Sequence, residues 1–279
     1  MLYKTREEIL KDFKKQIEEG KILLGVGAGT GITAKCAEAA GADMLIIYNS
    51  GRFRMAGRGS LSGFLSYGDA NLIVQEMGRE VIPVVKKTPV LAGVCGTDPF
   101  RVMPLFLKKL KEEGFNGVQN FPTVGLIDGN FRKNLEATGM SYSMEVDMIH
   151  EAHKLDMLTC PYVFNPGEAA DMAQAGADCL VAHMGLTTKG SIGASVAKSL
   201  DECCEDITEI IKAGKKINPD IMVIAHGGPI SEPRDAEYVI RNVPEVDGFF
   251  GASSIERLAS ERGMTALAKE FKSIPGNHH

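Results

Sequence analysis

The stretch Met222-Val-Ile-Ala-His-Gly-Gly-Pro229, together with Val246-Asp-Gly-Phe-Phe-Gly-Ala-Ser-Ser-Ile255, decides the fold. Each half is a short apolar run that ends in glycines and leads into a helical pattern, so the pair predicts strand, turn, helix, strand, turn, helix. Backbone N–H groups in two such turns suit an anion such as phosphate. We therefore expect an anion site made by Gly227, Gly228, Gly251 and Ser253.

Eight apolar runs occur along the chain, and most are continuous rather than alternating, which is typical of parallel strands buried on both faces. The runs span residues 22–27, 44–48, 90–95, 117–121, 157–164, 179–184, 221–225 and 248–250. Helical patterns separate them. This alternation predicts a (β/α)8 TIM barrel that forms a single domain over residues 1–279. An open doubly wound sheet is the alternative, because the same pattern serves both folds.

The helix boundaries can also be predicted. Thr5-Arg-Glu-Glu8 is a capping box that begins a helix ending at Gly20, and we expect this helix to cover the closed end of the barrel. Asp98-Pro99 and Asn165-Pro166 predict helix starts, and Ser253 or Ser254 is expected to cap the last helix. A helix is also expected after Ser195, with Val196 on its apolar face. The run 81–85 contains Pro83 and is interpreted as a connector.

Composition excludes several functional classes. The net charge is −5 and the chain has no basic block, so neither nucleic acid nor an anionic membrane is an expected partner. No apolar run reaches the about 18 residues of a membrane span, and the charged N-terminus is unlike a signal peptide. A cytoplasmic protein is expected. The six cysteines form no C-x-x-C pair and are interpreted as reduced and structural, and His278-His279 as remnants of a purification tag.

Three long connections, 49–68, 122–142 and 185–195, follow strands and should therefore lie on the catalytic face of the barrel. Arg52, Arg54 and Arg58 in the first and Lys189 in the third suit the covering of an anionic ligand. The glycines of Gly25-x-Gly-x-Gly-x-Gly31 do not have dinucleotide-binding spacing and predict a tight turn near the ligand.

Three titratable residues are candidates for catalysis. His183 and His226 end predicted strands on the catalytic face, where a histidine can transfer protons near neutral pH. A hydrogen-bonded structural role is the alternative for each. Asp69 precedes a helical pattern and is interpreted as an N-cap, whatever else it does.

Several motifs resemble a known family. Tyr48-Asn-Ser-Gly51 and the segment Ser66-Tyr-Gly-Asp69 are similar to the phosphoenolpyruvate mutase and isocitrate lyase superfamily. The phrases Val26-Gly-Ala-Gly-Thr-Gly31, Phe121-Pro-Thr-Val-Gly125 and Ala225-His-Gly-Gly-Pro229 resemble, more closely, the phosphoenolpyruvate hydrolase-like TIM-barrel family.

The resemblance implies that Tyr48, Asn49, Ser50 and Gly51 hold a phosphonate or carboxylate, and that Asp69 acts from a gating loop. It also implies a magnesium site built from acids after the third and fourth strands. Here only Asp98 is acidic at those positions, so the magnesium site is weakened. Exchange of the last helix between subunits is a further implication, and residues 254–271 carry a wide apolar stripe, so a homo-oligomer is expected.

The expected function is that of a lyase or hydrolase acting on a small anionic 2-oxo acid or enol phosphate, such as phosphoenolpyruvate or phosphonopyruvate. A phosphosugar isomerase or synthase is the second hypothesis. A ligand-binding or protein-interaction module without catalysis is the third, since the fold alone does not choose among them.

Overall fold

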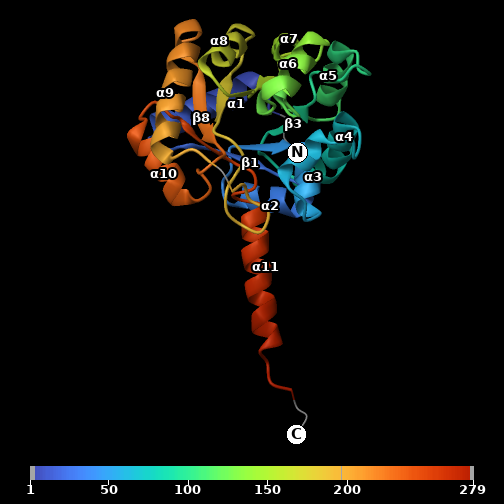
Figure 1. Ribbon diagram of the computed structural model, residues 1–279, viewed down its shortest axis with the longest axis vertical. Helices are drawn as coiled ribbons and strands as arrows, with labels where there is room; N and C mark the ends of the chain where they lie inside the picture. Colours follow the sequence, from blue (N-terminus) through green and yellow to red (C-terminus); the bar gives the residue numbers. More distant parts are fainter. Residues whose placement is uncertain (1–3, 196, 277–279) are drawn as a thin grey trace.

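The computed structural model describes residues 4–195 and 197–276, in which the strands form one parallel sheet that curls round into a barrel (Figure 1). The strand order is β5-β4-β3-β2-β1-β9-β8-β7-β6. The strands are β1 (Leu23–Gly27), β2 (Met44–Ile47), β3 (Val90–Val94), β4 (Gly117–Asn120), β5 (Leu158–Thr159), β6 (Tyr162–Val163), β7 (Cys179–His183), β8 (Met222–His226) and β9 (Gly248–Gly251).

The fifth predicted strand is divided in two. Leu158–Thr159 pairs with β4 and Tyr162–Val163 pairs with β7, so this one run brings the two edges of the sheet together. Pro161, which lacks a backbone N–H, lies between the halves. The prediction of a (β/α)8 barrel is confirmed.

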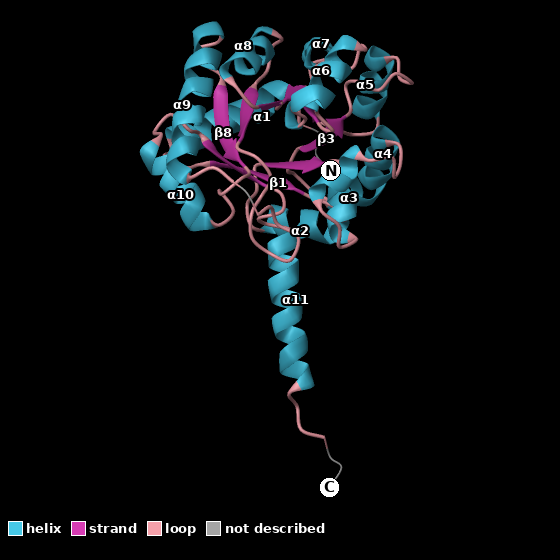
Figure 2. Ribbon diagram, in the orientation of Figure 1, coloured by secondary structure: helices cyan, strands magenta, loops and turns pink. Residues whose placement is uncertain are grey.

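Helices surround the sheet, as Figure 2 shows. They are α1 (Arg6–Glu18), α2 (Gly31–Ala39), α3 (Asn49–Met55), α4 (Ala70–Val81), α5 (Met103–Glu112), α6 (Gly129–Ala137), α7 (Tyr142–Lys154), α8 (Pro166–Gln174), α9 (Leu200–Ile217), α10 (Pro233–Asn242) and α11 (Arg257–Lys272), with short 3-10 turns η1 (Ser60–Phe64), η2 (Ile82–Val84) and η3 (Val124–Leu126). The interpretation of residues 81–85 as a connector is therefore confirmed, because η2 lies within them. None of the helices in the described part of the chain combines the length and the hydropathy that a membrane span requires.

Two predicted helix starts are wrong. The helix after β3 begins at Met103 rather than Pro99, because Asp98 instead accepts a hydrogen bond from the Phe100 N–H within a turn. The last helix begins at Arg257, and neither Ser253 nor Ser254 caps it. The helix after the third long connection begins at Leu200, and Val196 lies outside the described residues.

Helix α1 covers the amino end of the barrel, as expected. Its capping box forms, and Ile9 and Phe13 are buried. Arg6 pairs with Asp178, whose carboxylate also accepts from the Thr159 N–H. Asp178 stands just before β7, so this bond network joins α1 to β5 and to the start of β7.

Helix α11 leaves the barrel as a straight arm (Figure 1). Of its residues only Arg257 and Leu258 are buried. Met264, Leu267 and Phe271 are 69%, 55% and 67% exposed. The arm therefore presents an apolar face that this chain does not cover.

Candidate active site

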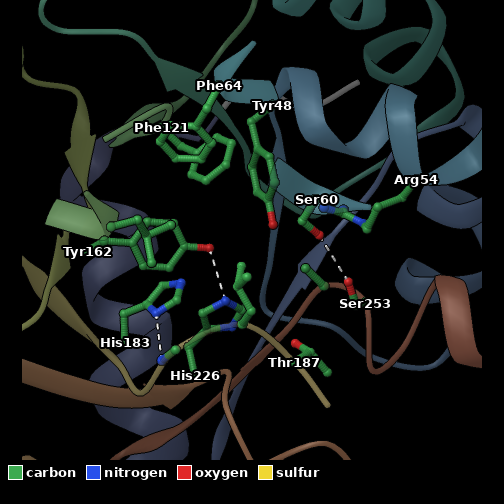
Figure 3. Close-up of a pocket in the computed structure, with 14 residues that line it drawn as sticks. Tyr48, Arg54, Ser60, Phe64, Phe121, Tyr162, His183, Thr187, His226 and Ser253 are labelled. Carbon is green, nitrogen blue, oxygen red and sulfur yellow. Dashed lines mark hydrogen bonds between the residues drawn. The ribbon is translucent and has the colours of Figure 1, made fainter. Parts of the chain in front are cut away.

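A cavity lies at the carboxyl ends of the strands, in the mouth of the barrel (Figure 3). Residues at or just after the ends of β2, β4, β7, β8 and β9 reach it, together with Tyr162 of β6, η1 and part of the connection 185–195. Its walls combine hydroxyl groups, two imidazoles, one guanidinium and several aromatic rings. The lining residues are Tyr48, Arg54, Ser60, Phe64, Phe121, Leu126, Tyr162, His183, Gly185, Leu186, Thr187, His226, Ala252 and Ser253.

Among the residues that the structure describes, Arg54 is the only cationic side chain in this wall. Its side chain is 1% exposed and pairs with Glu256, which is 0% exposed, at an Nη2 to Oε2 distance of 3.2 Å. The Glu256 carboxylate also accepts from the Gly29 N–H. The Nε of Arg54 is buried without a hydrogen-bond partner. Since buried donors are nearly always paired, this N–H is available to an acceptor that enters the cavity.

The residues before Arg54 in α3 support the cavity rather than line it. The Ser50 hydroxyl donates to the carbonyl of Ser60 at 2.6 Å, and Asn49 donates to the carbonyl of Gly63 at 2.8 Å. These bonds fix η1, which carries Ser60 and Phe64 to the cavity. A Cβ on Gly29 would lie 2.4 Å from the Gly51 carbonyl oxygen, so the first glycine turn and α3 need this close approach. Of the four residues predicted on this stretch, only Tyr48 lines the cavity.

His183 and His226 face each other, with ring centroids 4.8 Å apart. His226 lies 2.7 Å through Nδ1 from the Phe250 carbonyl oxygen, which can only accept, so Nδ1 carries the proton and Nε2 faces the Tyr162 hydroxyl at 3.3 Å. In His183, Nδ1 accepts from the Gly185 N–H at 3.1 Å, which leaves the proton on Nε2. The two rings therefore offer an acceptor and a donor.

Both imidazoles are neutral near pH 7. Burial, with a contribution from the charge of Arg54 and against the opposing hydrogen bond to the Phe250 carbonyl, lowers the pKa of His226 to about 4. Burial, with a contribution from His226, also lowers the pKa of His183 well below its usual range. Burial raises the pKa of Tyr162 well above its usual range, so its hydroxyl keeps its proton.

The depressed pKa of His226 predicts a pH dependence of stability. In the unfolded chain His226 takes up a proton at the ordinary pKa of about 6.5, whereas in the folded chain it does so only near pH 4. The stability that is present above pH 6.5 is therefore lost as the pH falls toward 4. We expect the free energy of unfolding to fall by about 3 kcal/mol more in the parent than in His226→Asn over this range. Urea unfolding at the two pH limits measures the difference. Equal losses in both proteins would contradict it.

Tyr162 is positioned by a carboxyl group that was not predicted from the sequence. Glu145 on α7 is fully buried, and its oxygens accept from Asn120 Nδ2 at 2.6 Å and from the Val124 N–H at 2.8 Å. Burial raises its pKa to about 8. Asn120 in turn accepts from the Tyr162 N–H at 2.7 Å. The end of β4 and the aromatic wall of the cavity are thus held by one polar network.

Only part of the anion site predicted at the paired glycine turns lies at the cavity. Ser253 lines it, and its hydroxyl lies 3.4 Å from that of Ser60. The N–H of Gly228 instead donates to the Gly185 carbonyl at 2.7 Å. Gly227 is needed for the same close approach, since a Cβ there would lie 2.4 Å from the Gly185 oxygen. A Cβ on Gly251 would meet Ile255, so this glycine serves packing.

The acids singled out by the resemblance lie away from the histidines, in a neighbouring cleft. Asp69 caps α4 through the Leu72 N–H, as predicted, and pairs with Arg101 at 2.6 Å. Asp98 accepts from Asn71 at 2.8 Å and lies 3.7 Å from Arg101.

These residues do not fit a magnesium ion. A hard cation needs several oxygen ligands, whereas the Asp98 carboxylate is already engaged by N–H donors. Within residues 4–195 and 197–276 no group of three or more His, Cys, Asp or Glu side chains could hold a metal. The end of β4 contributes Gln119 and Asn120 where carboxylates would be required.

The other predicted covering cations lie elsewhere. Arg52 lies on the exterior of α3 and pairs with Glu76 of α4, and Lys189 pairs with Glu232 at 3.0 Å. Thr187, from the same long connection as Lys189, does line the cavity, as expected for that connection.

Comparison with known proteins gives relatives and a family. The ToMV susceptible protein tm-1(GCR26) of Solanum lycopersicum is 60% identical over 266 residues, which are 95% of this chain and 35% of that protein. The chain thus spans about a third of the length of this curated relative.

Solved structures share the fold at low identity. A phosphonopyruvate hydrolase in complex with oxalate and magnesium has a TM-score of 0.58 and 16% identity, covering 98% of this chain and 93% of that one. A 2,3-dimethylmalate lyase, of the PEP mutase/isocitrate lyase superfamily, has a TM-score of 0.58 and 14% identity over 96% and 89% of the two chains. At such identity these likenesses show the fold alone.

The family match is of a different kind, because it extends over residues 8–274. It covers every strand of the barrel and the residues of the cavity in its mouth. The chain belongs to the phosphoenolpyruvate hydrolase-like family.

Proposed function

We propose that the chain is an enzyme that binds a small 2-oxo acid or its enol phosphate in the mouth of the barrel and cleaves it as a lyase or hydrolase. The family, and a fold shared with phosphonopyruvate hydrolase and dimethylmalate lyase, support this reaction type. The cytoplasmic location expected from the sequence belongs to the same proposal.

One observation carries the proposal: the unpartnered Nε of Arg54 in the wall of the cavity. A carboxylate or phosphoryl oxygen is the acceptor that a guanidinium pairs with best. The hydroxyls of Tyr48, Ser60 and Ser253 line the same cavity and can complete the coordination of an anion.

The histidines supply the chemistry of the proposal. Cleavage beside a carbonyl develops negative charge on the carbonyl oxygen, and a preorganised donor stabilises that charge. Nε2 of His183 is such a donor. Nε2 of His226 is a lone-pair acceptor beside the Tyr162 hydroxyl; it can take a proton from the substrate or an attacking water molecule and return that proton to the product. Arg54, rather than a metal ion, supplies positive charge in this scheme.

The cavity must open to admit a ligand. Its free space is about 30 Å³, which holds only a few water molecules. Leu186 and Thr187 belong to the connection 185–195 and lie in its wall, so we propose that this connection moves. Such gating is common where a reaction excludes water.

Phosphonopyruvate, phosphoenolpyruvate and oxaloacetate are the substrates to assay, each with a chelator and again with magnesium. The proposal expects turnover of at least one of them and a rise in melting temperature with oxalate, because a ligand of the folded state stabilises it. Absence of both effects, with all compounds, would overturn it.

The role of Asp69 as a catalytic acid remains a prediction, because its carboxylate reaches the cavity only if residues 56–69 move. Asparagine caps a helix as well as aspartate does, so Asp69→Asn should keep the melting temperature, while Asp69→Ala should lose about 1 kcal/mol. If Asp69 transfers a proton, Asp69→Asn also lowers kcat by about 10² to 10⁴. Full turnover in Asp69→Asn would restrict this residue to the helix cap.

A homo-oligomer is part of the proposal, and the exposed face of α11 supports it. Contact with a second copy would bury Met264, Leu267 and Phe271. Light scattering should give a multiple of 30.0 kDa. Replacing Leu267 and Phe271 by serine should return the mass to that of one chain. A parent protein that stays at one chain's mass at micromolar concentration would contradict this.

A further inference from the structure

A second and larger cleft adjoins the cavity. It has a volume of about 850 Å³ and lies between η1, the turn after β3 and the segment 122–140. Phe64 and Leu126 belong to the walls of both spaces, so these two side chains lie between the cleft and the cavity.

We propose that this cleft holds an apolar substituent of the substrate, so that the preferred ligands are 2-oxo acids or enol phosphates bearing a hydrocarbon or aryl chain. The proposal rests on the function proposed above and names its substrate class. The anionic head lies at Arg54, and the chain passes Phe64 and Leu126 into the cleft.

Exposure of apolar side chains supports the proposal. Phe100 and Phe131 are 88% and 67% exposed, and both border the cleft with Leu61 and Leu65, which are 47% and 56% exposed. Single exposed apolar residues are ordinary, whereas several around one concave space mark a binding site. The volume lies in the range of about 300–1,000 Å³ that is usual for small-molecule sites.

Charge argues for a neutral occupant. Arg101 pairs with Asp69 and lies 3.7 Å from Asp98, so two carboxylates outweigh the one cation at this edge. The remaining acid in the wall, Asp128, would repel a second anionic group. A ligand charged at both ends is therefore disfavoured, and a hydrocarbon chain meets the apolar walls without unpaired charge.

The test measures binding of pyruvate, 2-oxobutanoate, 2-oxohexanoate and 2-oxooctanoate to the full chain by calorimetry. Each methylene that enters the cleft should tighten binding by about four-fold, the fold-change that corresponds to about 0.8 kcal/mol. In Phe131→Ser the ratio of the 2-oxooctanoate to the pyruvate affinity should collapse. Ile32→Ser, at a site on α2 that is 65% exposed and outside the cleft, is the matched control and should keep the parent ratio.

Each other outcome has a definite meaning. Binding of pyruvate without a gain along the series overturns the apolar site and leaves the proposed function standing. Failure of every acid, and of oxalate, overturns both. If Phe131→Ser keeps the parent ratio of 2-oxooctanoate to pyruvate affinity, the hydrocarbon chain of the ligand does not lie in the cleft, and the proposal is overturned. A change of mass in Phe131→Ser by light scattering would make the cleft a contact between copies, which also overturns the proposal.

Discussion

Replacing Arg54 by methionine is expected to abolish oxalate binding and to lower the free energy of unfolding by about 3–5 kcal/mol. The change leaves the Glu256 carboxylate, which is 0% exposed, without its cationic partner. It also removes the guanidinium from the cavity wall. Urea unfolding and calorimetry with oxalate measure the two effects.

Arg52→Met is the matched control, because Arg52 lies on the same helix and pairs with Glu76 while its side chain is 35% exposed. An exposed pair contributes about 0–1 kcal/mol, so this variant should remain stable and bind oxalate. If Arg54→Met fails to fold, Arg54→Lys keeps a charge beside Glu256 and removes the Nε donor. Oxalate binding at parent strength in Arg54→Lys would show that the unpartnered Nε does not hold the anion.

Replacing His183 by asparagine is expected to lower kcat by about 10² to 10³, the usual loss when one donor to a developing oxyanion is removed. An asparagine oxygen can accept from the Gly185 N–H as Nδ1 does now, so the loop stays in place while the Nε2 donor disappears. Steady-state kinetics on a substrate identified in the assays above measures the loss.

Two further variants of histidine make this result interpretable. His183→Gln places an amide donor near the position of Nε2 and should recover part of kcat. His150→Asn, on the exposed side of α7, should turn over like the parent. Unchanged kcat in His183→Asn would remove this ring from the mechanism.

The alternation of parallel strands and helices was predictable because its signal is local, although the same alternation also serves an open doubly wound sheet. Continuous apolar runs such as Met44–Ile47 and Cys179–His183 are buried throughout, and their spacing alone requires parallel strands with helices between. The start of the last helix was not predictable in this way. Ser253 and Ser254 have the chemistry of caps, but Ser253 faces the cavity instead.

The cavity was predictable only in outline. The end of a strand marks His183, His226 and Tyr48 as candidates, since each follows an apolar run. The partner of a donor, in contrast, depends on distant segments. Nothing local distinguishes Arg54 from Arg52, yet one meets Glu256, 202 residues away, and the other reaches the exterior. The glycine turn at Gly228 was misjudged for the same reason, because its N–H is taken by Gly185.

The network that ties Arg6 and Asp178 to the start of β7 stands at the opposite end of the barrel from Arg54 and the histidines. The amino-end bonds thus form a set that stabilises the fold without belonging to the proposed ligand site, whereas Arg54 and the histidines form a set that contributes to both. Mutations that retune the mouth leave the amino-end bonds intact, so the two sets can evolve at different rates. A lineage can therefore acquire a new substrate, or give up catalysis altogether, on an inherited barrel.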